Sequence, residues 1–143
     1  MNRCIRAILS LHNIFIQLPS ADERREISNS FASKYRFITC IGCIDGTLII
    51  PSSERPSYYG ADMFTRKCYY ALNVLLICDN VSRIRYCNAG WVGSVYDNRV
   101  FRNTKIYQST QSYFSEAEYL LVDPRGSRLE TTFEAFNPRK SSE

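Results

Sequence analysis

Four short apolar runs, each bounded by turn-forming or charged residues, most strongly constrain how this chain can fold. Runs of this length that are rich in Ile, Val, Leu, Tyr and Cys are typical of strands. They cover residues 37–44, 68–78, 83–90 and 118–122. Asp79 and Asn80 have the chemistry of a turn, which predicts a hairpin between the second and third runs. Between the third and fourth runs, Ser94 can cap a helix that carries Val100 and Phe101 on one face. The predicted order is therefore β-β-β-α-β, a mixed α/β fold.

Two helices are predicted before the first strand. Residues 3–17 carry apolar side chains at spacings of three and four, and Pro19 ends this segment. Ser20 and Glu23 have the spacing of a capping box, which predicts a second helix over residues 21–34. Its inner face would carry Ile27 and Phe31. We expect a helical segment at 1–34, an α/β domain at 35–123 and an irregular tail at 124–143.

Composition fits one globular domain. The chain has 143 residues, of which 45% are hydrophobic and 13% aromatic, too many for a disordered chain. The net charge of +4 would favour approach to a polyanion without establishing it. No run reaches the roughly 20 apolar residues that a bilayer helix needs, so we expect no membrane span and no signal peptide.

The six cysteines are unevenly spaced, and most fall inside apolar runs, which favours buried free thiols in a reducing compartment. Cys40 and Cys43 form one C-x-x-C pair. Zinc is not favoured, because a structural site takes about four ligands and the chain has a single histidine, His12. A catalytic redox pair is not favoured either, because the two cysteines lie in a predicted strand instead of at a helix start.

Three aspartates stand where a strand ends or a helix begins: Asp45, Asp97 and Asp123. If the first and fourth strands lie side by side and parallel, their carboxyl ends meet at one edge, where a docked helix can add a third acid. Clustered carboxylates repel one another unless a cation neutralises them, and oxygen ligands suit Mg²⁺ or Mn²⁺. Each aspartate taken alone also fits an ordinary turn, helix-capping or strand-ending role, so both interpretations stay open at this point.

Four ordered blocks resemble the PIF/Harbinger transposase-derived nucleases of the DDE superfamily, particularly fungal versions. The blocks are CIGCIDGTLI at 40–49, CYYALNVLLICD at 68–79, NAGWVGSVYDNRVFRN at 88–103 and EYLLVD at 118–123. The resemblance spans roughly residues 20–123. It implies a ribonuclease H-like fold and a nuclear, DNA-cleaving ancestry.

The resemblance also implies functional residues. It places the family's metal-binding and catalytic acids at Asp45, Asp97 and Asp123, which would hold two divalent cations, Mg²⁺ or Mn²⁺, for attack on a DNA phosphodiester. Basic residues that could contact phosphate, or equally form a solvated charged face, are Arg66, Lys67, Arg99 and Arg102. DNA is the implied substrate, and target recognition would fall to a separate DNA-binding partner protein.

The chain departs from the family pattern at several positions. Leu48 and Tyr96 stand where the family usually has histidine, and the sequence after Asp123 differs from the usual one. The family's final glutamate lies on a later helix, and the sequence ends at Glu143 before such a helix. The glutamates of the tail, Glu130, Glu134 and Glu143, are too close to Asp123 for that role. We therefore expect a truncated domain with little or no cleavage and a tendency to self-associate through uncovered sheet surface.

Two other roles remain open from the sequence alone. The chain could be a non-catalytic nucleic-acid-binding or protein-binding module that kept its basic surface, or a structural remnant without a selected role.

Overall fold

The computed structural model describes residues 2–50, 64–65, 68–122 and 134–136, the last three as backbone only. Its elements run α1 (Arg3–Ser10), α2 (His12–Phe15), α3 (Ala21–Tyr35), β1 (Cys40–Ile49), β2 (Leu72–Cys78), β3 (Ile84–Val92), α4 (Asp97–Arg102), α5 (Lys105–Gln108), α6 (Thr110–Tyr113), β4 (Tyr119–Val122) and β5 (Glu134–Phe136). The predicted order β-β-β-α-β is confirmed, and the helical connection consists of three short helices.

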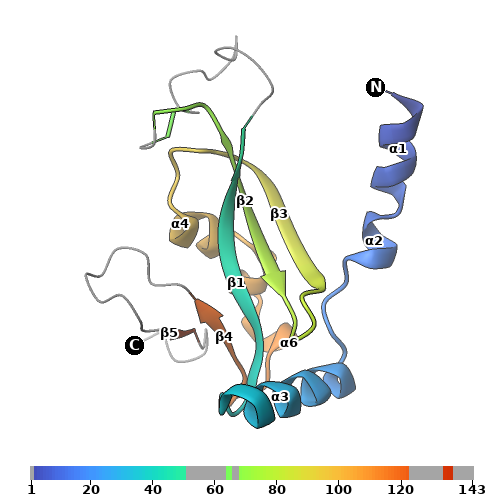
Figure 1. Ribbon diagram of the computed structural model, residues 1–143, viewed down its shortest axis with the longest axis vertical. Helices are drawn as coiled ribbons and strands as arrows, with labels where there is room; N and C mark the ends of the chain where they lie inside the picture. Colours follow the sequence, from blue (N-terminus) through green and yellow to red (C-terminus); the bar gives the residue numbers. More distant parts are fainter. Residues whose placement is uncertain (1, 51–63, 66–67, 123–133, 137–143) are drawn as a thin grey trace.

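The strands form one mixed sheet in the order β3-β2-β1-β4-β5 (Figure 1). The first three strands are an antiparallel meander, and β4 returns parallel to β1. The turn between β2 and β3 forms as its sequence predicts, because the Asp79 carboxylate accepts hydrogen bonds from the amides of Val81 and Arg83. The parallel pairing of the first and fourth strands, on which the predicted acidic edge depends, is present.

Helix α3 begins as its sequence predicts. The Ser20 hydroxyl accepts a hydrogen bond from the Glu23 amide, and the Glu23 carboxylate accepts one from the Ser20 amide. These reciprocal bonds satisfy backbone donors that a helix start leaves unpaired. Ile27 and Phe31 are buried on the inner face and pack with Cys40 and other side chains of the sheet. The helix therefore covers one face at the start of β1.

The sequence upstream of α3 does not form the single packed helix that its apolar spacing predicts. The segment divides into α1 and α2, and neither helix has a buried residue. Ile8, for example, is 68% exposed. Figure 1 shows both helices standing away from the sheet. Within the described residues, no helix has both the length and the apolar character required to cross a membrane.

The second face of the sheet carries the larger core. Ile44, Leu75 and Ile77 of the sheet pack with Val100 and Phe101 of α4, among others. Because side chains alternate along a strand, this face of β1 also carries Gly46, whereas Cys43 and Asp45 lie on the opposite face. Because of this alternation, Asp45 lies on the face of β1 opposite to the face that α4 covers.

Two local predictions were wrong. Tyr96, not Ser94, is the N-cap of α4, so Asp97 is the first residue of the helix instead of the third. The tail expected to be irregular contains β5, which pairs antiparallel with β4. The pairing of β4 with β5 joins residues more than ten positions apart, so the local sequence pattern of residues 134–136 does not predict it.

Candidate functional site

Asp97 is held at the start of α4 by a buried amide. Nδ2 of Asn73 donates to Oδ1 of Asp97 at 2.7 Å and to the Val95 carbonyl at 3.0 Å. Asn73 lies on β2 and is only 3% exposed. One side chain therefore fixes both the carboxylate and the backbone just before the helix.

Gly46 of β1 makes room for the same carboxylate. A Cβ atom added at Gly46 would overlap the carboxyl group of Asp97. Only glycine permits this approach, so the helix start and the strand are matched in shape. The structure thus brings Asp97 against the residue that follows Asp45 in the sequence.

Asp45 lies in the middle of β1, because this strand continues to Ile49 and does not end before Asp45 as predicted. It lies beside Gly46 but on the other face of the strand. Its side chain is exposed, and its Oδ1 accepts a hydrogen bond from the Gly46 amide at 2.8 Å. The unbroken register from Cys43 to Ile49 against β2 fixes the alternation in this stretch. The two aspartates therefore flank the strand instead of facing each other.

The third predicted acid, Asp123, lies outside the described residues. The residue before it, Val122, pairs with Ile44 in the parallel ladder, and Ile44 directly precedes Asp45. The last described residue of β4 is thus level with the residue before Asp45. The last described residue of β4 therefore lies beside the middle of β1 and not beside its carboxyl end.

Two of the four predicted basic residues lie within the described part of the chain, and two do not. Arg66 and Lys67 lie outside the described residues. Arg99 and Arg102 are exposed on α4, and no ion pair among the described residues involves either of them. Both residues follow Asp97 within two turns of helix.

The donors suit a hard divalent cation by chemistry. Asp45 and Asp97 offer only oxygen, the ligand type that Mg²⁺ and Mn²⁺ prefer. Among the described residues, no group of three His, Cys, Asp or Glu side chains could hold a metal ion. A complete ligand set would therefore have to include residues beyond those described, of which Asp123 is the predicted one.

Sequence reasoning missed Asn73 and the special role of Gly46. An asparagine inside the apolar run of β2 was the available signal, because a buried polar side chain in a core strand needs a partner. Its Oδ1 atom is buried without a hydrogen-bond partner among the described residues. Gly46 gave no separate signal, since Asp-Gly is also common in turns.

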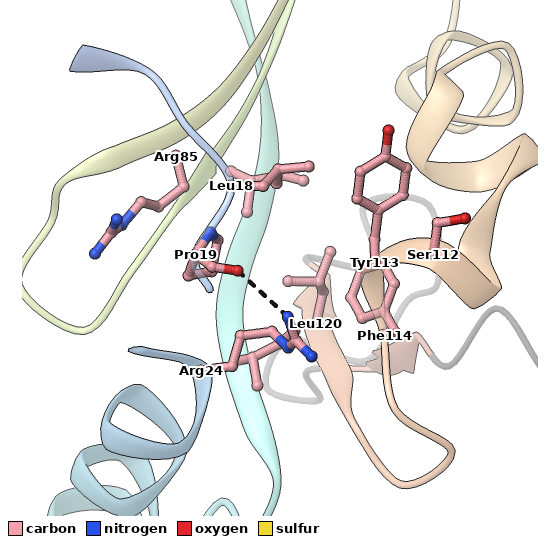
Figure 2. Close-up of a pocket in the computed structure, with 10 residues that line it drawn as sticks. Leu18, Pro19, Arg24, Arg85, Ser112, Tyr113, Phe114 and Leu120 are labelled. Carbon is pink, nitrogen blue, oxygen red and sulfur yellow. Dashed lines mark hydrogen bonds between the residues drawn. The ribbon is translucent and has the colours of Figure 1, made fainter. Parts of the chain in front are cut away.

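A cavity of about 240 Å³ lies near the carboxyl end of β2, away from Asn73 (Figure 2). Its lining is mostly apolar and includes Leu18, Ile77 and Phe114, with Arg24 and Arg85 at its polar side. Both arginines are paired: Arg24 with Glu118 at 3.0 Å, and Arg85 as described below. The cavity lacks the predicted acids and offers no unpaired charge to a ligand.

Arg85 joins three parts of the chain. Its guanidinium donates to Asp79 at 2.8 Å and to Glu23 of α3 at 3.0 Å. Burial pushes the pKa of Asp79 upward, but the amides of Arg83 and Val81 and the Arg85 guanidinium outweigh it and leave the pKa below its ordinary value of 3.8. The pKa of Glu23 is also lowered, first by the Ser20 amide and then by Arg85.

Asp79→Asn should destabilise the protein in a pH-dependent way. The Asp79 side chain is 1% exposed, and losing its charged hydrogen bonds should cost about 1–2 kcal/mol at pH 7. A lowered native pKa gives stability above the unfolded pKa that is lost as pH falls through the native pKa. The difference from wild type should therefore shrink below about pH 4 in urea titrations.

The matched control is Asp22→Asn, whose side chain is 88% exposed in a surface pair with Arg25. It should change the free energy of unfolding by a few tenths of a kcal/mol at most. An Asp79→Asn penalty that stays constant down to pH 3 would contradict the ionic interpretation of this cluster.

The topology of the sheet indicates a class of fold. A mixed sheet with β4 parallel to β1, preceded by an antiparallel meander and a helical connection, is consistent with a ribonuclease H-like arrangement. A family model described as "DDE superfamily endonuclease" matches residues 44–131, more than half of the chain. The chain belongs to this family. No curated protein and no solved structure matches the chain.

Proposed function

We propose that this chain is a transposase-derived nuclease domain, related to the PIF/Harbinger group, that binds divalent cations and acts on DNA phosphodiesters. The observation that carries the proposal is the parallel register of β1 and β4, in which Ile44 pairs with Val122. An aspartate directly follows each of these residues in the sequence, Asp45 and Asp123. Carboxylates brought together on neighbouring strands suit a divalent cation.

Asp45 and Asp123 are the proposed principal ligands of Mg²⁺ or Mn²⁺. The exposure of Asp45 leaves it accessible to a cation and to a phosphate group from solvent. Two neighbouring carboxylates repel each other, and a divalent cation would neutralise this repulsion. When bound, the divalent cation lowers the pKa of water and neutralises charge on the phosphate.

Asp97 is proposed as the third acid of the site. Its main role is to hold the start of α4 against β1. Its Oδ1 accepts from Asn73, and its carboxyl group rests on Gly46, so the start of α4 is tied to β1 directly beside Asp45. A shift of Asp97 would move the strand backbone that carries Asp45. The role therefore combines negative charge with control of strand position.

Weak cleavage is part of the proposal. Leu48 and Tyr96 replace histidines that the resemblance implies, so proton transfer or phosphate contact by imidazole is lost at both positions. Leu48 pairs with Asn73 across the β1–β2 ladder, and Tyr96 caps the helix that begins with Asp97. Both replacements thus lie beside the proposed acids.

A second candidate is a DNA-binding domain without catalysis. It is favoured by the exposure of Arg99 and Arg102, by the absence of ion pairs to them among the described residues, and by the net charge of +4. Two cations at this spacing on a helix can contact successive phosphates. A nuclear location and a separate sequence-reading partner belong to both candidates as proposals.

A plasmid assay separates the two candidates. Supercoiled DNA is incubated with the protein and Mg²⁺ or Mn²⁺, and nicking is measured beside DNA affinity by fluorescence anisotropy. The nuclease proposal expects slow nicking that needs the cation and is abolished in Asp45→Asn. Binding without any nicking, unchanged by that substitution, supports the second candidate.

The double variant Arg99→Gln/Arg102→Gln should weaken DNA binding about tenfold at low salt and reduce the salt dependence. Arg25→Gln is the control, because Arg25 is also exposed but lies on α3. Equal losses in both variants would show that α4 is not the DNA-contacting surface.

A further inference from the structure

Two cysteines lie directly opposite each other on adjacent strands. Cys43 of β1 and Cys78 of β2 are paired in the antiparallel register, so their side chains share one face. Paired residues in such a ladder have Cα atoms about 4.5–5.5 Å apart. Disulfides span about 4.4–6.8 Å between Cα atoms, so the backbone needs no movement to join them.

The strands are in close contact at this point. A Cβ atom added at Gly42 would lie 2.8 Å from the Cys78 carbonyl oxygen. The glycine thus lets β1 approach β2 next to the cysteine pair. This close approach holds the two thiols in register.

The two thiols differ in their exposure to solvent. Cys43 is exposed and Cys78 is half-buried, whereas Cys40 is fully buried and donates to the Gly42 carbonyl. Burial raises the pKa of Cys40 to about 11, which keeps this nearby competitor protonated and inert. Cys43 is therefore the thiol of the pair that an oxidant in solution reaches first.

We propose that Cys43 and Cys78 form a reversible cross-strand disulfide when the protein meets a disulfide oxidant such as oxidised glutathione. The Cys43 thiolate attacks the glutathione disulfide, releasing one glutathione thiol and forming a mixed disulfide. The Cys78 thiolate then attacks the Cys43 sulfur and releases the second glutathione thiol. Each cysteine gives up one proton, and the two electrons reduce the glutathione disulfide. The inference does not depend on nuclease activity.

The test is oxidation of the full chain by oxidised glutathione at low protein concentration, followed by non-reducing tryptic mapping. We expect an intramolecular product lighter by two hydrogen atoms, in which the peptide carrying Cys43 is joined to the peptide carrying Cys78. Dithiothreitol should reverse it. Cys43→Ser and Cys78→Ser should each lose the link.

Control variants remove the other cysteines of the same peptides. Cys40→Ala and Cys68→Ser should both keep the link, because neither residue pairs across the β1–β2 ladder. Loss of the link in Cys68→Ser with retention in Cys78→Ser would overturn the proposal. A wild-type protein that yields only glutathione adducts or intermolecular dimers, while circular dichroism shows it folded, would overturn it as well.

Discussion

Gly46→Ala is expected to lower the free energy of unfolding by about 3 kcal/mol, because the new methyl group would occupy the position of the Asp97 carboxyl group. Neither partner can move easily. Gly46 lies inside the β1–β2 ladder, and Asp97 is held by Asn73. Urea unfolding followed by fluorescence of Trp91, the single tryptophan, measures the change.

A double-mutant cycle identifies the cause. Asp97→Ala alone should cost about 1–2 kcal/mol, since Asn73 loses one acceptor. The double variant Gly46→Ala/Asp97→Ala should be clearly more stable than the sum of the two changes predicts, because the carboxylate that clashes is gone. Thr47→Ala, on the opposite face of β1, is the control and should show no coupling to Asp97→Ala. Additive effects of Gly46→Ala and Asp97→Ala would contradict the contact.

Asp45→Asn is expected to weaken Mn²⁺ binding by about 100-fold, measured as loss of the rise in Tm that Mn²⁺ gives the wild type. The substitution keeps the side-chain shape and a neutral oxygen that can accept from the Gly46 amide. It removes only the charge. Asp123→Asn should have a similar effect, because the two residues are proposed as ligands of one site.

Glu26→Gln, an exposed change on α3, is the matched control and should leave the Mn²⁺ response unchanged. Asp97→Asn distinguishes the two parts of that residue's proposed role. An amide oxygen can still accept from Asn73, so a smaller loss of Mn²⁺ affinity than in Asp45→Asn indicates a positioning part. A full Mn²⁺ response in Asp45→Asn would contradict the metal site.

The sequence predicted the features whose causes are local. The capping box of Ser20 and Glu23 and the turn at Asp79 both form, because their hydrogen bonds join residues within four positions. The order of elements along the chain, β-β-β-α-β, followed from the spacing of the apolar runs. The parallel pairing of β1 with β4 was a condition of the predicted acidic edge, and the structure shows that pairing.

Features that depend on distant contacts could not be predicted. Ser94 has the right chemistry for an N-cap, yet Asn73 binds the Val95 carbonyl and the helix starts later, at Asp97. The alternation that separates Asp45 from Asp97 depends on the register with β2. For the helical segment at 3–17, apolar spacing predicted a buried face, but spacing alone does not supply a surface to pack against.

Two adjacent residues of α3 form ion pairs with residues on or next to different strands, β3 and β4. Glu23 binds Arg85 of β3, and Arg24 binds Glu118 just before β4. In the sheet order, β2 and β1 lie between these two attachment points. Helix α3 therefore connects β3 with the residue just before β4 and helps to fix the distance between them. A shift of α3 by one turn along its axis would break both ion pairs together.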